Sequence, residues 1–138
     1  MRLLWHSNAP WVPSGYGVQT ARVTKLLQGF IRQGGSPLTD MRISAFCGLE
    51  FGPVVFDGVP VYGNQWLMAD RFGSITLAAA CEDFQPDIVL ALMDGWATPR
   101  PEGAKLVVWF PVDHDSLTPA TMAAIEGRSG LLVPTESG

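Results

Sequence analysis

The sequence predicts an α/β fold with a doubly wound, mostly parallel sheet of the Rossmann-like type. Two observations support this. Strand-like and helix-like segments alternate along the 138 residues, and segments such as IVLAL and LVVWF are apolar at every position. A strand that is apolar throughout is buried on both faces, as in a parallel sheet with helices on each side. The alternation is typical of βαβ units. We therefore expect one domain over residues 1–138.

The first half of the chain predicts two strands, a helix and a hairpin. Residues 2–6 are strand-like, and a helix is expected over 17–33, with Gly34-Gly35 as its stop. Residues 42–47 predict the next strand, and 51–62 a hairpin that turns at Asp57-Gly58. The apolar stripe of the helix is expected to comprise Val18, Ala21, Leu26, Leu27, Phe30 and Ile31.

The second half continues the alternation. A helix is expected over 66–83, with a break near Gly73-Ser74, followed by a strand over 87–92. Residues 105–110 predict a further strand, 119–126 a helix and 130–133 a last strand. No internal repeat or low-complexity segment interrupts this order, which favours a single α/β unit.

Composition and charge exclude several classes of function. The net charge is −4 and the Lys and Arg residues are scattered, so nucleic acid is not an expected partner. No apolar run is long enough for a membrane span, and the N-terminus lacks a signal-peptide pattern, so we expect a cytoplasmic protein. Cys47 and Cys81 are interpreted as buried free thiols. A disulfide or a metal site is not expected.

The loop after the first strand contains Gly15, Tyr16 and Gly17, at the expected start of a helix. Glycine lets the backbone approach a ligand, and the free N–H groups of a first helical turn favour phosphate. The spacing is not G-x-G-x-x-G, so a dinucleotide fingerprint is not supported. The alternative is a tight turn without a ligand.

Polar and aromatic residues follow two later strands, where ligands bind in parallel sheets. Asp94 and Trp96 follow one strand, and Asp113, His114 and Asp115 follow the next. An imidazole between two carboxylates can handle a proton near neutral pH. The alternatives are structural: the aspartates cap helices, His114 lies on the surface and Trp96 fills the edge of the core.

Four ordered motifs carry a resemblance to a known family. They are LLWHSNAPWVPSGYGVQTARV, FCGLE, LALMDGW and VVWFPVDHDSLTP, and together they span essentially the whole chain. The chain resembles the N-terminal domain of a family 4-type glycosyltransferase of the GT-B fold, of the bacterial and bacteriophage kind with SGYG and PVD motifs. The resemblance implies retaining, metal-independent transfer of a sugar from a nucleotide-sugar donor to an acceptor that remains unspecified.

The same resemblance assigns roles to individual residues. It places Gly15, Tyr16 and Gly17 at the donor phosphates and His114 near the donor sugar. Asp113, next to His114 in the PVDHD run, is a further catalytic candidate because it could handle charge as the donor bond breaks. It places Trp11, Asp94 and Trp96 on the acceptor side. No cofactor is implied, because the nucleotide-sugar is a substrate.

The chain departs from the family in ending before the nucleotide-binding domain. Thr135 and Glu136 look like the start of a further helix rather than an end. We therefore expect a truncated protein whose missing half is a C-terminal domain or a second chain, weak or inactive alone. The uncovered last strand would expose an apolar patch, so a homo-oligomer is a further expectation.

One other class of function stays open at this stage. A stand-alone, flavodoxin-like module could bind a phosphorylated ligand or a protein partner. Ser7 and Asn8 follow the first strand where receivers of that type carry acidic residues, which counts against it. A Ser-His-Asp hydrolase is not supported, because the chain has no G-x-S-x-G elbow.

Overall fold

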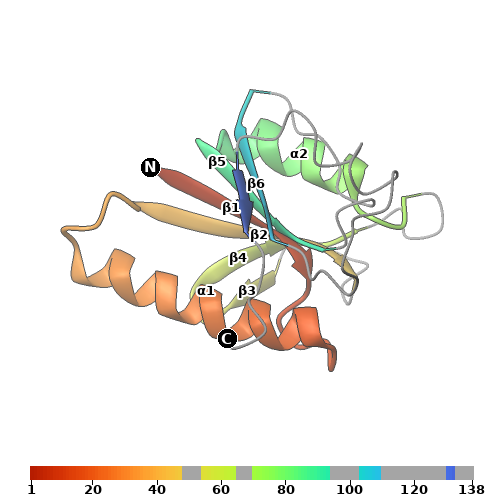
Figure 1. Cartoon of the computed structure of the whole chain (residues 1–138), viewed down its shortest axis with the longest axis horizontal. Coiled ribbons are helices and arrows are strands. Elements are labelled where there is room, and N and C mark those ends of the chain that lie inside the picture. The colour runs from red at the N-terminus through yellow and green to blue at the C-terminus, as the bar shows by residue number, and fades with distance from the viewer. Residues whose placement is uncertain (48–53, 65–69, 94–102, 110–129, 133–138) are drawn as a thin grey trace.

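A central sheet with helices on both sides organises the protein (Figure 1). The computed structural model describes residues 1–47, 54–64, 70–93, 103–109 and 130–132. The described elements are, in chain order, β1 (Arg2–Asn8), α1 (Gly15–Gln33), β2 (Asp40–Cys47), β3 (Val54–Phe56), β4 (Val59–Tyr62), α2 (Ser74–Phe84), β5 (Ile88–Leu92), β6 (Lys105–Trp109) and β7 (Gly130–Leu132). The predicted α/β class is confirmed, and the helix expected over 119–126 lies outside the described residues.

The described strands form one sheet in the order β3-β4-β2-β1-β5-β6-β7. All neighbouring pairs are parallel except β3 and β4, which form an antiparallel hairpin. The predicted mostly parallel sheet is therefore confirmed, and its arrangement is compatible with a Rossmann-like fold. β1 lies between β2 and β5 and is buried from Leu3 to Asn8, as expected of a central strand.

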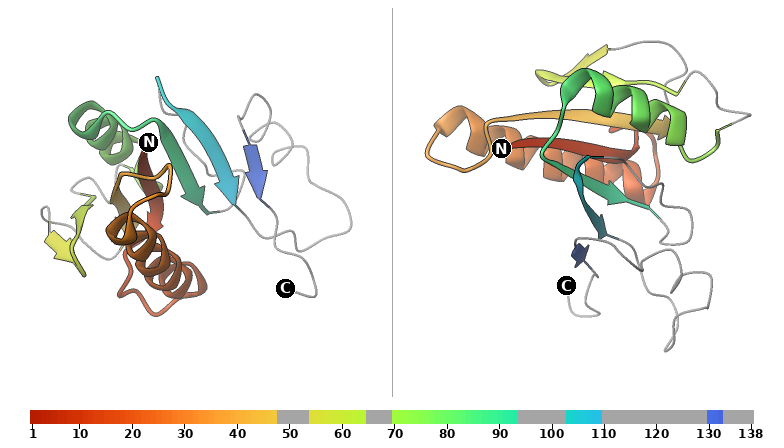
Figure 2. Two further views of the ribbon diagram at one scale, coloured as in Figure 1. Left: turned by 90° about the vertical axis from the view of Figure 1, so that its left-hand side faces the viewer. Right: turned by 90° about the horizontal axis from the view of Figure 1, so that it is seen from above.

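Helices α1 and α2 pack on opposite faces of the sheet (Figure 2). The side chains of β1 alternate between the two faces of the sheet. Leu3 and Trp5 pack on the α1 side, and Leu4 packs on the α2 side. On the α2 side the buried cluster is Leu4, Phe46, Leu77, Ala80, Phe84, Val89, Ala91, Met93, Leu106 and Val108. Apolar burial on both faces is the main source of stability in such a sheet.

The inner face of α1 is more polar than predicted. Its fully buried residues are Gly17, Thr20 and Thr24. The indole Nε1–H of buried Trp5 donates to Thr20 Oγ1 at 3.0 Å, and the Thr20 hydroxyl donates to the carbonyl of Tyr16 at 2.7 Å. These bonds satisfy the hydroxyl, which otherwise would be costly to bury.

The predicted apolar stripe of α1 is therefore only partly right. Leu27 and Ile31 pack against the sheet as expected. Val18, Leu26 and Phe30 instead face outward, with 42%, 62% and 49% of their surface exposed. The threonines and the small Gly17 take the positions that these larger side chains were expected to fill.

The hairpin at the sheet edge confirms the predicted turn. Asp57 and Gly58 connect β3 to β4 with φ angles of 49° and 84°. Two consecutive positive φ values are the geometry that favours an Asp-Gly pair in a two-residue hairpin turn.

The helix expected over 66–83 is only partly confirmed: 66–69 lie outside the described residues, and the helix boundary falls at Gly73-Ser74, where a break was expected. Residues 70–73 form a turn, and α2 begins only at Ser74. Gly73 adopts a left-handed conformation with φ of 72°, and the carboxylate of Asp70 accepts hydrogen bonds from the N–H groups of Ser74 and Ile75 at 2.8 and 2.7 Å. Because their N–H groups are capped by a side chain, Ser74 and Ile75 form the first turn of α2.

Cys47 and Cys81 are free thiols, as predicted. Both are half-buried rather than fully buried, and they lie at the margin of the cluster on the α2 side. Burial raises the pKa of Cys81 above that of an exposed thiol, so it is a weak nucleophile at neutral pH.

Candidate functional site

The strand order reverses at β1. The chain leaves β1 through α1 to reach β2 on one side, and β5 pairs with β1 on the other. In open parallel sheets, ligands bind at such a reversal, outside the carboxyl ends of the strands. Loop 9–14 and the first turn of α1 follow the carboxyl end of β1 (Figure 1), so this end of the sheet is the candidate site.

Ser14 fixes the start of α1. It is the N-cap residue, in an extended conformation, and its Oγ accepts a hydrogen bond from the Gly17 N–H at 3.1 Å. The side-chain amide of Asn8, at the end of β1, donates to the same oxygen at 2.9 Å. Strand end, cap and first helical turn are thus joined through one hydroxyl, which holds the loop between them in place.

Gly17 is required by packing. A Cβ atom at this position would lie 2.1 Å from the carbonyl oxygen of Val12, much closer than atoms can approach. Gly17 is buried, and its φ angle is not positive. The close approach that the sequence predicted at Gly17 therefore occurs within the protein, between the helix and its own preceding loop.

Gly15 has a different environment. It is exposed, and a Cβ atom there would meet nothing within 4 Å. As the first residue of α1, it presents a backbone N–H that has no partner within the helix. The first turn of α1 contains no acidic residue, so the positive end of the helix dipole is not neutralised there.

The two aromatic residues of the loop region lie on the α1 side of the sheet. Tyr16 is half-buried and packs at the margin of the core. Trp11 is 43% exposed, and its ring centroid lies 6.1 Å from that of Phe56 in β3. An exposed indole held against a second ring is a suitable surface for stacking on a sugar or an apolar group.

The N-terminus of α2 is closed to ligands. Both oxygens of the Asp70 carboxylate accept hydrogen bonds from its first N–H groups, as described above. A negative charge already occupies the position where an anion would bind. Between the two described helices, α1 therefore offers the open N-terminus.

His6 is a buried polar residue beside this region to which the sequence analysis assigns no role. Its Nε2–H donates to the carbonyl of Phe72 at 2.8 Å, and its Nδ1 accepts from the Ser44 hydroxyl at 3.0 Å. Burial lowers the pKa of His6 from 6.5 to about 4, so the ring is neutral at pH 7. His6 thus anchors the turn before α2. Its position within an apolar central strand was the sequence feature that could have indicated a buried structural histidine.

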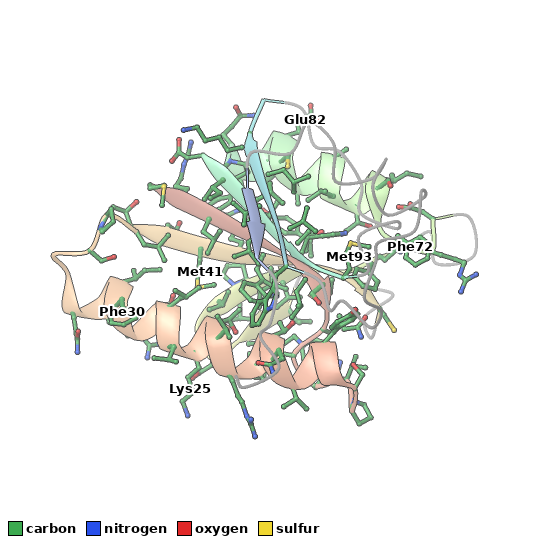
Figure 3. The ribbon with its side chains drawn as sticks, viewed as in Figure 1. Lys25, Phe30, Met41, Phe72, Glu82 and Met93 are labelled. Atoms are coloured by element: carbon green, nitrogen blue, oxygen red, sulfur yellow. The ribbon has the colours of Figure 1, made fainter. Side chains whose placement is uncertain are left out.

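Ser7 joins β1 to β5 at the reversal point. Its hydroxyl donates to the carbonyl of Leu92 at 2.6 Å, and both residues are buried. Next to it, the Met93 N–H donates to the carbonyl of Trp109 at 3.2 Å, which extends the alignment to β6. The carboxyl ends of β1, β5 and β6 are thereby held level, and Met93 marks this end of β5 in Figure 3.

The structure brings together part of the predicted site. Gly15, Tyr16 and Gly17 lie in the first turn of α1, with Trp11 in the loop before it. Asp94, Trp96, Asp113 and His114 lie outside the described residues. Within the described part of the chain, no group of three or more His, Cys, Asp or Glu side chains could hold a metal ion.

Neither described helix is long and apolar enough to cross a bilayer. No protein-family model, curated protein or solved structure matches the chain.

Proposed function

We propose that this chain is the acceptor-side domain of a retaining glycosyltransferase, a doubly wound half of a GT-B fold. It would transfer a sugar from a nucleotide-sugar to an acceptor, with a second domain or chain holding the nucleotide. The proposal is supported by the strand order that reverses at β1 and by helices on both faces of the sheet. The sequence motifs described above supply the family resemblance.

The observation that carries the proposal is the open, acid-free N-terminus of α1. Gly15, its first residue, is exposed, and within the described part of the chain a Cβ atom added there would meet nothing within 4 Å. In sugar transfer, the bond between the anomeric carbon and the diphosphate oxygen breaks, and a bond to the acceptor oxygen forms as the acceptor loses its proton. Negative charge develops on the departing diphosphate, and the positive end of a helix stabilises such charge.

The remaining predicted residues complete the proposed site. Trp11 is 43% exposed and is proposed to contact the acceptor. Asp94 and Trp96, outside the described residues, are proposed for the same role on the sequence resemblance alone. His114 and Asp113 are proposed to act near the donor sugar, where an imidazole and a carboxylate can move a proton or stabilise positive charge.

Substitution of Gly15 tests the proposal. Gly15→Asp places a carboxylate at the helix N-terminus, which favours the helix but repels a diphosphate. Gly15→Ala keeps the N–H group and adds only a methyl group to open space. We expect a nucleotide diphosphate sugar that binds the wild-type chain to bind Gly15→Ala equally and Gly15→Asp about 10-fold or more weakly, measured by titration calorimetry. Equal binding by all three proteins would refute this role of α1.

A binding module for a phosphorylated ligand would use the same helix N-terminus, so binding alone does not separate the two classes. Release of nucleotide diphosphate does. A glycosyltransferase breaks the sugar–phosphate bond, at least slowly with water as acceptor, whereas a binding module leaves the donor intact. Binding without any release, also in the presence of an added nucleotide-binding domain, would favour the module.

A further inference from the structure

The outer face of α1 combines exposed apolar and basic side chains. Leu26 and Phe30 are 62% and 49% exposed, and Arg22 and Lys25 are exposed beside them. Lys25 points away from the sheet in Figure 3. Exposed large apolar residues next to one another on a surface helix indicate a binding surface.

These residues form two adjacent rows along the helix. Val18, Arg22, Leu26 and Phe30 follow at intervals of four and make one row, here called the outer row. At 1.5 Å per residue, the outer row is about 18 Å long. Lys25 and Arg32 are two turns apart and make a second row beside it.

All the charged residues of this helix are basic. α1 contains Arg22, Lys25 and Arg32 but none of the 13 acidic residues of the chain. The protein as a whole has a net charge of −4. A basic helix on an acidic protein is attracted to an anionic partner while the rest of the molecule is repelled, which orients α1 toward that partner.

The basic side chains are not paired with acidic groups of the described structure. The ion pair found among the described residues joins Arg42 to Asp83, on the α2 side. Arg32 donates to the backbone carbonyl of Asp57 at 3.3 Å, which leaves its charge uncompensated. Arg22 and Lys25 form no ion pair with a described carboxylate. Among the described residues, then, no carboxylate neutralises the charges of Arg22 and Lys25.

We propose that the outer face of α1 docks on an anionic lipid surface, with Leu26 and Phe30 inserted at the headgroup boundary and Arg22 and Lys25 on lipid phosphates. A surface helix with apolar side chains beside basic ones binds membranes in this orientation, parallel to the bilayer plane. This inference does not depend on the proposed sugar transfer.

The shape of the surface favours a bilayer over a peptide. Peptides and partner helices bind in grooves, whereas α1 is a single helix on the outside of the molecule (Figure 2). At Gly29, between the two rows, a Cβ atom would meet nothing within 4 Å, whereas the turn between β3 and β4 lies beside the end of the second row, where Arg32 donates to the carbonyl of Asp57. The long stems of Arg and Lys can lie along the apolar boundary while their charges reach the phosphates.

Vesicle sedimentation tests the proposal with the full 138-residue chain. We expect binding to vesicles of phosphatidylcholine with 30% phosphatidylglycerol, and at least 10-fold weaker binding to phosphatidylcholine alone. Arg22→Gln with Lys25→Gln should weaken binding about 30-fold, at about five-fold per charge. Leu26→Ser with Phe30→Ser should weaken it by a similar factor, because both side chains lose their apolar burial in the bilayer.

Matched variants on other surfaces serve as controls. Ile75→Ser with Val55→Ser removes two exposed apolar residues, and Arg71→Gln with Lys105→Gln removes two exposed charges, all outside α1. Both double variants should bind vesicles like the wild-type chain. Weakening by the control variants equal to that of the α1 variants would overturn the proposal.

Position 29 gives a test that does not rely on loss of binding. Gly29→Lys and Gly29→Glu both replace glycine by a good helix former in open space, so their effects on folding are matched. Gly29→Lys should bind the anionic vesicles about 30-fold more tightly than Gly29→Glu, since the two differ by two charges. Equal binding, or no vesicle binding by the wild-type chain, would overturn the proposal. Binding of the wild-type chain to an acidic protein but not to vesicles would also overturn the lipid proposal.

Discussion

Replacement of Gly17 by alanine probes the packing that fixes the loop before α1. The added Cβ would lie 2.1 Å from the Val12 carbonyl oxygen, 3.0 Å from its carbonyl carbon and 3.1 Å from its Cβ. Two of these three atoms belong to the backbone, so a change of side-chain rotamer cannot relieve the contact. The loop must move by about 1 Å to reach a tolerable distance, which strains the Ser14 bonds to Gly17 and Asn8.

The expected loss of stability follows from this displacement. Overpacking by one methyl group in a close-packed region costs about 1–3 kcal/mol, and the backbone contact places Gly17→Ala at the upper end of that range. For a chain of this size, 1 kcal/mol corresponds to about 4 °C in Tm, so we expect Tm to fall by about 8–12 °C.

Gly15→Ala is the matched control, because the same atom added two residues earlier meets nothing within 4 Å. It should leave the stability unchanged or raise it by about 0.4–1 kcal/mol through the restricted unfolded chain. Thermal unfolding followed by circular dichroism measures both variants. If Gly17→Ala melts within about 2 °C of Gly15→Ala, which is half the shift for 1 kcal/mol, the packing argument is refuted.

Two further predictions concern the region before α2. His6 is neutral in the folded protein down to its pKa of about 4, whereas the unfolded chain takes up this proton near pH 6.5, so stability should be full above about pH 7 and fall by roughly 3 kcal/mol as the pH drops to 4. Urea unfolding of His6→Gln should lack this part of the pH dependence, and curves parallel to those of the wild type would contradict it. Asp70→Ala should lower the free energy of unfolding by about 1–2 kcal/mol, because the N–H groups of Ser74 and Ile75 lose their acceptor. A loss equal to that of Glu82→Ala, an exposed carboxylate within α2, would argue against capping.

The strands were predictable from sequence because a strand that is buried on both faces is apolar at nearly every position. The continuously apolar segment of β5 predicts a buried strand, and the Asp-Gly pair predicts the turn between β3 and β4 without help from the rest of the fold. These are local signals, and the structure confirms both.

The helix faces were less predictable because tertiary contacts decide them. Hydropathy directs Leu26 and Phe30 inward, but the sheet accepts Thr20 because Trp5 offers an indole donor there. Likewise, the start of α2 depends on Gly73, which adopts a left-handed conformation. A Cβ atom added at this position would lie 2.9 Å from His6 Cε1. Neither contact is visible in the local sequence.

The candidate site was predictable in part for the same reason. A strand, a glycine loop and a helix in succession locate the α1 N-terminus from sequence alone. The different environments of the two glycines were not predictable. Gly17 packs against the Val12 carbonyl, whereas a Cβ atom at Gly15 would meet nothing within 4 Å. The capping of α2 by Asp70, which leaves α1 as the open helix end, also required the structure.

The central claim is that a diphosphate binds at the N-terminus of α1. Its most direct test is to follow backbone amide signals by nuclear magnetic resonance while a nucleotide diphosphate sugar is added to the 138-residue chain. We predict saturable shifts at the amides of Gly15 and Tyr16, with the amides of Ser74 and Ile75 unchanged under their Asp70 cap. Shifts at α2 without shifts at α1, or no shifts with any donor tested, would contradict the claim.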